Sequence, residues 1–360
     1  MDHTDVKMVE IGVHKMLETL VSKIVERSMT YKSKVIEARK LVDAIEDHSR
    51  HLSEQKEFTD LLAELTESGY ELLNQADISW KIAGIVVLDC LLDLEDEMQI
   101  VTSQAVMNTR RINIANSLRD KVFENHKIGL DAGNVVLREA ALSIGHLARI
   151  ATPGESEHLE RVYYPVAMRM LSTQTSDFDR LGGSLIIKEL AINAPTMIFA
   201  KKKPIYNALT EAVCEKNYIV RETAAEALET ALVLVSQRES MVEWISTSLK
   251  LVDDGLASER SEVVIGVLLI LDIVIGGVVV PLQELNQIMK TLNRAVHVII
   301  FNVLALRKSA DGDVRRKVIN IIPRLANAFS GTFTIPNQYT NPLNFLHYTV
   351  NYLVELIRAK

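Results

Sequence analysis

Glycine, proline and aromatic residues are scarce in this chain. Its 360 residues include 15 glycines, 8 prolines and only 5% aromatic side chains, and the combined share of glycine and proline is about half the usual one. β-Sandwiches, barrels and propellers need many turns, so this composition argues against them. Apolar residues make up 48% of the chain, which argues against a disordered protein. An aliphatic, helix-rich fold is therefore predicted.

Cysteine is almost absent. The two cysteines, Cys90 and Cys214, lie among apolar residues at helical spacing. This pattern predicts small buried side chains in a reducing compartment rather than a disulfide framework. The first thirty residues interrupt their apolar positions with acidic residues, so we expect no secretory signal and assign the chain to the cytosol.

The chain also lacks an excess of positive charge. Its 40 basic and 47 acidic residues give a net charge of −7. Proteins that grip a nucleic-acid backbone need clustered positive charge, so we expect no nucleic-acid partner. Protein partners fit this balance better.

A long apolar run occurs once, at residues 263–280, where Asp272 is the single charged residue. Hydropathy alone leaves a membrane helix open, but the pair Gly276 and Gly277 should end the helix before it spans a bilayer. We therefore expect no membrane insertion. A helix that is buried on nearly all sides within a helical stack explains the same apolarity.

Similar stretches recur along the chain at a nearly constant interval. REAALSIGHLA begins at Arg138, RLGGSLIIKELA at Arg180 and RETAAEALETA at Arg221, at intervals of 42 and 41 residues. A period near 41 that is built from two helices is typical of HEAT and armadillo-type arrays, in which each pair buries its apolar face against the next pair. The sequence therefore predicts an all-α fold, a HEAT-type α-solenoid (α-α superhelix) of about eight stacked helix pairs.

The two ends of the predicted solenoid differ. Residues 1–70 hold less regular helices with many alternating charges, which is typical of an N-terminal helical cap. Residues 71–360 carry the repeats. Their last predicted helix, at residues 342–359, has an apolar stripe with nothing after it to cover it. Because a solenoid needs a polar terminal repeat, we expect the array to continue beyond Lys360.

The sequence shows no pattern typical of an active site. It has neither a glycine-rich phosphate loop nor a set of kinase motifs, since Asp177-Phe178-Asp179 differs from Asp-Phe-Gly at its third residue. His48 and His51 have a spacing that could offer two metal ligands, but no second ligand pair accompanies them, so a solvated helix end is expected. We predict no catalytic residue, no cofactor and no metal.

Two groups of basic residues have structural explanations. Arg138, Arg180 and Arg221 occupy equivalent positions at the starts of inner helices, so we expect inter-repeat structural bridges from their guanidinium groups to carboxylates of adjacent links. The run at residues 201–203 is either a solvated loop or a docking point for an acidic partner.

Residues 107–120, MNTRRINIANSLRD, contain three arginines and two asparagines with few core-type residues. This segment is the best candidate for an exposed contact surface. A plain polar helix face is the alternative.

Several of these stretches resemble one family closely. The amino-terminal HEAT repeats of the target-of-rapamycin (TOR) serine/threonine kinases are similar in order across roughly residues 60–330, and the run ELAINAPTMIF followed by a helix that ends in SQRE is the most specific part. Family members can carry a much longer insertion in the region that corresponds to residues 276–309, and this chain has only a short segment there. The resemblance therefore does not define the partner contacts of this region. The resemblance is carried by NTRRINIANSLRD from Asn108, NVVLREAALSIGHLARIA from Asn134, LIIKELAINAPTMIF from Leu185, VRETAAEALETALVLVSQRE from Val220, GVLLILDIV from Gly266 and INIIPRLANAF from Ile319.

The resemblance implies a scaffold of nutrient and growth signalling rather than an enzyme. Its parent would be a very large kinase whose catalytic part lies outside these residues. Implied partners are raptor-like and rictor-like subunits, a Rheb-like small GTPase and a second TOR copy. By the same resemblance, Arg110, Arg111, Asn113 and Ile114 are candidate GTPase-facing residues. It also implies cytoplasmic residence, with recruitment to lysosomal or other endomembranes through partners.

Two other classes of protein are also compatible with the sequence. The repeat period alone also fits a self-contained HEAT adaptor, such as a phosphatase scaffold or a transport receptor. An enzyme would instead bind ATP as the isolated chain.

Overall fold

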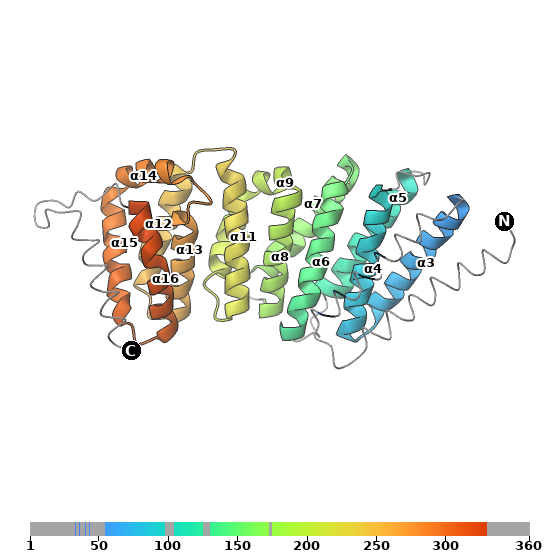
Figure 1. The fold of residues 1–360 in the computed structure, drawn as a ribbon, viewed down its shortest axis with the longest axis horizontal. Coiled ribbons are helices and arrows are strands. Elements are labelled where there is room, and N and C mark those ends of the chain that lie inside the picture. Colours follow the sequence, from blue (N-terminus) through green and yellow to red (C-terminus); the bar gives the residue numbers. More distant parts are fainter. Residues whose placement is uncertain are drawn as a thin grey trace, which may run out of the picture. The chain divides into compact units, whose positions relative to one another are not determined.

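The computed structural model describes residues 55–97, 104–124, 130–172 and 175–329, together with Ser33, Ile36, Lys40 and Asp43. Within these residues the regular elements are fourteen α-helices, one short π-helix and one 3₁₀ turn, without any strand. In each of the two units of the chain, Met1–Ala200 and Lys201–Lys360, the long helices stand side by side in adjacent pairs (Figure 1). The predicted all-α solenoid architecture is thereby confirmed.

The first unit is built on a row of three inner helices. In this row α4 packs on α6 and α6 packs on α8, while α3 pairs with α4 and α7 pairs with α8. A second layer holds α5 and α7, which also contact each other. The elements are α3 Gln55–Asn74, α4 Ile78–Glu97, α5 Gln104–Leu118, the π-helix η1 Arg119–Phe123, α6 Leu130–Ile150, α7 Pro153–Met170, α8 Asp177–Asn193 and α9 Pro195–Ala200.

The second unit repeats this two-layer arrangement. One layer holds α11, α13 and α16, and the other holds α12 and α15, while α10 pairs with α11 and α12 pairs with α13. The elements are α10 Lys202–Ala212, α11 Tyr218–Ser236, α12 Val242–Leu256, α13 Ser261–Ile275, α14 Leu282–Thr291, α15 Asn293–Ala305, the 3₁₀ turn η2 Leu306–Lys308 and α16 Gly312–Phe329.

Helix starts in the first unit are specified by local sequence. The Thr152 side chain caps α7 and accepts from the N–H of Glu155, whose carboxylate accepts in return from the N–H of Thr152 at 2.6 Å. Ser176 and Asp179 form the same reciprocal pair at the start of α8. Such capping boxes satisfy amide groups that a helix leaves unpaired. Asp179, the third residue of the Asp177-Phe178-Asp179 run, is therefore a capping residue.

The apolar run of the second unit forms α13. The helix ends at Ile275 with Gly276 as its C-cap, and Gly277 has a φ of 77°, a left-handed conformation that favours glycine. Asp272 lies 2.8 Å from an Arg324 guanidinium nitrogen and 3.9 Å from Lys317 Nζ, both on α16. The single charge of the run thus joins two helices. Among the described residues, none of the helices combines the length and apolarity that crossing a membrane requires.

Three expectations fall wholly or mainly outside the described residues. His48, His51 and the apolar stripe of residues 342–359 lie there, and so do most residues of the N-terminal cap. Cys90 is buried in α4, Cys214 is half-buried after α10, and the two cysteines form no disulfide.

The basic run at residues 201–203 leads into α10 and contacts the start of α12. Lys202 Nζ lies 2.8 Å from a carboxylate oxygen of Glu239, and Lys203 Nζ lies 3.7 Å from one of Glu243. The indole N–H of Trp244 donates to the other oxygen of Glu239 at 2.7 Å. Glu239 therefore ties α10 to α12, and two of the three lysines have carboxylate neighbours within their own unit.

This clamp predicts acid sensitivity in the second unit. Hydrogen bonds from Lys202 and Trp244 hold the pKa of Glu239 below its ordinary value of 4.5. A depressed carboxylate pKa in the folded state contributes stability above the unfolded pKa, and this contribution is lost as the pH falls through the folded pKa. Urea unfolding from pH 7 to pH 3 should show a smaller acid-induced loss for Glu239→Gln than for the native chain. Glu243→Gln, which alters an exposed pair, should follow the native profile; identical profiles for all three proteins would contradict the clamp.

Candidate functional site

The candidate contact helix α5 divides its predicted partner-facing residues between two sides. Ile114 has 0% of its surface exposed and Arg111 has 8%, whereas Asn113 is exposed and Arg110 is partly exposed. Residues three to four positions apart share a helix face, so Arg111 and Ile114 point toward the core together. A partner that meets this helix can reach Arg110 and Asn113, while Ile114 anchors the helix.

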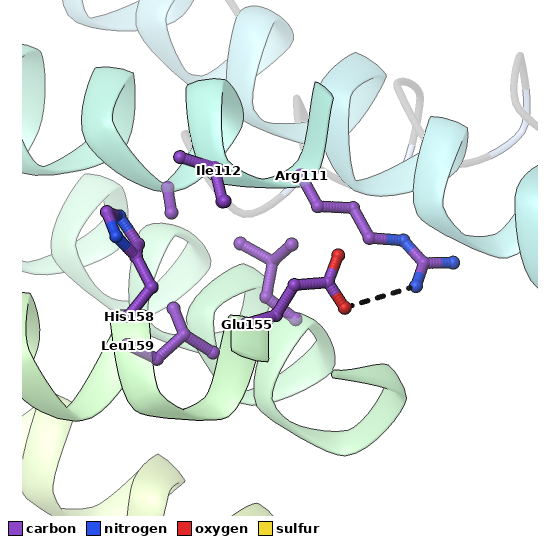
Figure 2. A pocket seen from close by; sticks show the side chains of 7 residues that line it. Arg111, Ile112, Glu155, His158 and Leu159 are labelled. Carbon is purple, nitrogen blue, oxygen red and sulfur yellow. Dashed lines mark ion pairs between the residues drawn. The ribbon is translucent and has the colours of Figure 1, made fainter. Parts of the chain in front are cut away.

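Arg111 joins three helices. Its guanidinium donates to the carbonyl of Ile150 at the end of α6 at 3.3 Å and lies 3.8 Å from a carboxylate oxygen of Glu155 in the first turn of α7 (Figure 2). A cation is favourable at a helix C-terminus, where carbonyl groups lack partners. Arg111 therefore has a structural role in this arrangement of α5, α6 and α7.

A small hollow with a cavity volume of about 10 Å³, partly open to solvent, adjoins this junction and is lined in part by Arg111, Glu155 and His158 (Figure 2). Ligand pockets usually measure about 300 Å³ or more. Burial lowers the pKa of His158, and the neighbouring Arg161 and Arg119 lower it further, so the imidazole is neutral at pH 7. Its Nε2 is buried with no hydrogen-bond partner in the described part of the chain. The hollow is too small to indicate an active site.

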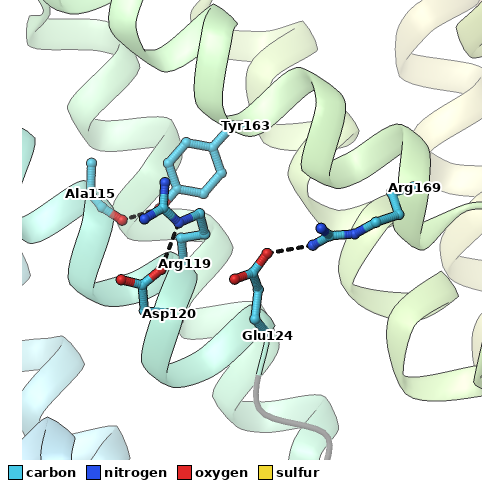
Figure 3. Close-up of polar contacts among 6 residues, drawn as sticks. All are labelled: Ala115, Arg119, Asp120, Glu124, Tyr163 and Arg169. Atoms are coloured by element: carbon cyan, nitrogen blue, oxygen red, sulfur yellow. Dashed lines mark hydrogen bonds and ion pairs between the residues drawn. The ribbon is translucent and has the colours of Figure 1, made fainter.

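A tyrosine hydroxyl interrupts the helix that follows α5. Tyr163 of α7 donates to the carbonyl of Ala115 (Figure 3). The backbone N–H of Arg119 donates to the Tyr163 hydroxyl. The hydroxyl therefore lies between two backbone groups, the Ala115 carbonyl and the Arg119 N–H, that bond directly to each other in a regular α-helix. Further along the helix, the N–H of Glu124 donates to the carbonyl of Arg119 at 2.9 Å. These two residues are five positions apart, which is the spacing of a π-helix. Side-chain insertion into the ladder thus accounts for the π-helix η1.

Tyr163 is fully buried, and burial raises the pKa of its phenol well above 10.0. The extra residue in η1 turns Val122 and Phe123 into the core, where each has 0% exposure. The Tyr163 and Phe123 rings pack edge to face with centroids 6.2 Å apart. A hydroxyl group of α7 thus lies at the start of the π turn that places these buried side chains.

The exposed end of η1 carries mixed charges. Arg119 Nε donates to an Asp120 carboxylate oxygen at 2.6 Å, and Arg169 of α7 pairs with Glu124 (Figure 3). Asp120 itself is exposed. Together with Asn113, these side chains form a polar, outward surface on α5, η1 and the adjoining part of α7.

Lys81 is a buried cation that the sequence pattern did not predict. It is 3% exposed, and its Nζ donates to the carbonyl of Leu73 at 3.0 Å and to that of Lys121 at 3.2 Å. Burial lowers the pKa of Lys81, and the nearby charge of Lys121 lowers it further. Lys81 thereby ties α3 and α4 to η1. Its only sequence signal is a lysine inside the apolar run SWKIAGIVVLDCLLDL.

The three equivalent arginines make different contacts. Arg221 donates to the carbonyls of Glu215 at 2.7 Å and Lys216 at 3.3 Å, in the link before α11. Arg138 donates to Asn134 within α6 at 2.9 Å. Arg180 is buried at the start of α8, with 8% exposure. These bonds of Arg138 and Arg221 go to uncharged oxygens, and bridges to carboxylates of adjacent links stay a prediction.

Metal-ligating side chains do not cluster in the described ranges, where no group of three or more His, Cys, Asp or Glu residues could hold an ion. His146 Nδ1 and Asp89 Oδ1 lie 3.1 Å apart between α6 and α4, but this pair has no third member.

Comparison with curated proteins gives several matches to serine/threonine kinases of the TOR type. No family model matches the chain. It is 25% identical over 318 residues to the serine/threonine-protein kinase TOR of Oryza sativa subsp. japonica, covering 88% of this chain and 12% of that protein. It is 25% identical over 262 residues to the serine/threonine-protein kinase tor1 of Schizosaccharomyces pombe, covering 71% of this chain and 10% of the relative.

The Drosophila melanogaster serine/threonine-protein kinase mTor is 26% identical over 189 residues, which cover 52% of this chain and 7% of that protein. The chain therefore spans 12% or less of the length of these relatives. Among solved structures, an engineered protein aligns with 93% of this chain and 92% of its own at 15% identity, with a TM-score of 0.33.

Proposed function

The chain is similar over most of its length to TOR serine/threonine kinases, and we propose that it is a non-catalytic, protein-binding scaffold region of such a kinase. The observation that carries the proposal is that the match to a TOR kinase covers 88% of this chain. The described residues of the chain are all helical or irregular. Protein kinases hold the phosphate-contacting lysine on a strand. Phosphoryl transfer is therefore assigned to other parts of the parent protein.

The proposed partners are raptor-like and rictor-like regulatory subunits, a Rheb-like small GTPase and a second copy of the kinase. Stacked helix pairs support this role because they present side chains along extended surfaces. The outward side of α5 and η1, with Asn113, Asp120 and Arg110, is the proposed GTPase contact. The proposal places the protein in the cytoplasm, with recruitment to endomembranes through its partners.

A self-contained HEAT adaptor is the weaker alternative. The rice, fission-yeast and fly relatives are all kinases by name, so the comparisons do not favour an adaptor.

A pull-down tests the proposed scaffold. Immobilised full chain should retain a raptor-like or rictor-like subunit, or a Rheb-like GTPase loaded with GTP in preference to GDP. Isothermal titration with magnesium ATP should give no binding. Failure of all three proteins to associate would overturn the proposed partners, and tight ATP binding would overturn the non-catalytic assignment.

The α5 contact makes a sharper prediction. The double substitution Arg110→Ala and Asn113→Ala should weaken binding of the Rheb-like GTPase about tenfold, because losing two residues at the centre of a contact should cost about 1.4 kcal/mol in total. Arg161→Ala, which removes an exposed arginine from α7, is the matched control and should leave the dissociation constant unchanged. Biolayer interferometry gives the constants, and circular dichroism checks the fold. Equal affinities for all variants would remove α5 from the contact.

A further inference from the structure

Two exposed aliphatic side chains lie on neighbouring inner helices of the first unit. Leu142 on α6 is 43% exposed and Ile192 on α8 is 55% exposed, and α6 and α8 pack directly against each other. Single exposed aliphatic residues are ordinary on protein surfaces. These two differ because a half-buried acid lies between their helices.

That acid is Glu189 of α8, which sits over the backbone of α6. A Cβ atom on Gly145 would lie 2.9 Å from Glu189 Oε2 and 2.7 Å from Asn193 Nδ2, so both side chains fill the space that the glycine leaves open. Asn193 donates to the backbone carbonyl of Glu189 at 2.9 Å rather than to its carboxylate. Within the described part of the chain, the Glu189 carboxylate has neither a hydrogen bond nor an ion pair.

The surroundings make this carboxylate poorly solvated. Burial raises the pKa of Glu189 above 4.5, and Lys188 opposes the shift only in part. On the other side of α6, Asp89 is already paired with His146 at 3.1 Å. Unlike Asp89, Glu189 therefore has carboxylate oxygens that can still accept hydrogen bonds from a partner. A charged group that is partly removed from water gains more from a partner than a fully hydrated one does.

We propose that Leu142, Glu189 and Ile192 form a docking patch for a basic side chain of a partner protein, with apolar residues on either side of that basic residue. A guanidinium or ammonium group would supply charge-assisted hydrogen bonds to the carboxylate. The aliphatic stem of the basic side chain and its apolar neighbours would cover Leu142 and Ile192. Arginine fits better than lysine because guanidinium is more weakly hydrated and can bind both carboxylate oxygens.

We call Leu142, Glu189 and Ile192 the basic-docking patch. Their chemistry favours a protein segment that carries a basic residue between apolar ones. A nucleic-acid phosphate would be repelled by Glu189, and a single carboxylate is a poor site for a metal ion. The patch rests on the proposed scaffold function, since it names the chemistry of one segment that the scaffold would recognise.

Methyl-labelled full chain provides the test. The probe is a synthetic peptide with one arginine flanked on each side by leucine, and its twin carries uncharged citrulline in place of arginine. Titration with the arginine peptide should shift the methyl resonances of Leu142 and Ile192, and the citrulline twin should bind at least tenfold more weakly. Glu189→Gln should weaken the arginine peptide by the same factor, whereas Glu222→Gln, on an exposed position of α11, should not.

Charge reversal gives a second, independent readout. Glu189→Lys should lose the arginine peptide and bind a peptide that carries glutamate at the same position. Equal binding of the arginine and citrulline peptides, or shifts confined to other methyl groups, would overturn the patch. If Glu189→Gln does not fold, the comparison of the arginine and citrulline peptides on the native chain still tests the patch.

The two proposals can fail separately. Retention of a raptor-like or rictor-like subunit without any selective arginine binding would refute the basic-docking patch alone. Selective arginine binding without any of the named partners would keep the patch and refute the TOR-type function.

Discussion

Replacing Gly266 by alanine should lower the free energy of unfolding of the second unit by about 2 kcal/mol, within the range of about 1 to 3 kcal/mol expected for overpacking. A Cβ atom there would lie 2.5 Å from the carbonyl oxygen of Val213 and 2.9 Å from the Cα of Cys214. Both atoms belong to the backbone at the end of α10, so the link must move as a whole. The better helix propensity of alanine, about 1 kcal/mol, offsets only part of the cost.

Urea unfolding followed by helical circular dichroism measures this effect, and hydrogen exchange in residues 213–218 should locate it. Gly154→Ala is the matched control, because nothing lies within 4 Å of its Cβ position. That substitution should be neutral or stabilising by up to about 1 kcal/mol. If Gly266→Ala were as stable as Gly154→Ala, α13 would not pack closely against residues 213 and 214.

Tyr163→Phe should destabilise the first unit by about 2 kcal/mol through the loss of a single oxygen atom. The change leaves the Ala115 carbonyl and the Arg119 N–H without the hydroxyl that joins them. We expect the helix then to form a direct bond between these two groups and to lose the π turn. One residue of register corresponds to about 100° of rotation, which would turn Val122 and Phe123 away from their buried positions.

Hydrogen exchange distinguishes this outcome from a general loss of stability. The amides of Arg119 and Glu124 should lose protection first in Tyr163→Phe, and urea unfolding gives the free energy. Tyr164→Phe alters the adjacent, partly exposed residue and should cost under about 1 kcal/mol. Unchanged protection at Arg119 in Tyr163→Phe would show that the hydroxyl does not hold the π turn.

Much of the fold follows from local sequence. The 41-residue period, the capping residues Thr152 and Ser176 and the glycine pair at residues 276 and 277 all act over a few neighbouring positions. Helix formation depends on bonds between residues four apart, so such signals can be read from the chain directly. For the same reason the stacking of pairs could be predicted from the period, because each helix carries more apolar surface than one partner can cover.

The candidate site was predicted only in part. Composition located the contact helix at residues 107–120 but did not separate the inward Arg111 and Ile114 from the outward Arg110 and Asn113. Arginine is usually exposed, and the buried position of Arg111 depends on the carbonyl at the end of α6 and on the Glu155 carboxylate of α7. The role of Tyr163 had no signal, because its partner Ala115 is 48 residues away in the sequence.

The sequence by itself determined that this chain is helical, where several of its helices start and stop, and that its helices must stack in pairs. The tertiary structure decided which polar residues leave the surface: Lys81 beneath η1, Asp272 against α16 and Glu189 over Gly145. Helix boundaries arise from contacts within a turn or two, whereas these side chains meet groups about 40 to 50 residues away. Their burial and charge state depend on how neighbouring helices approach, and only packing sets that distance.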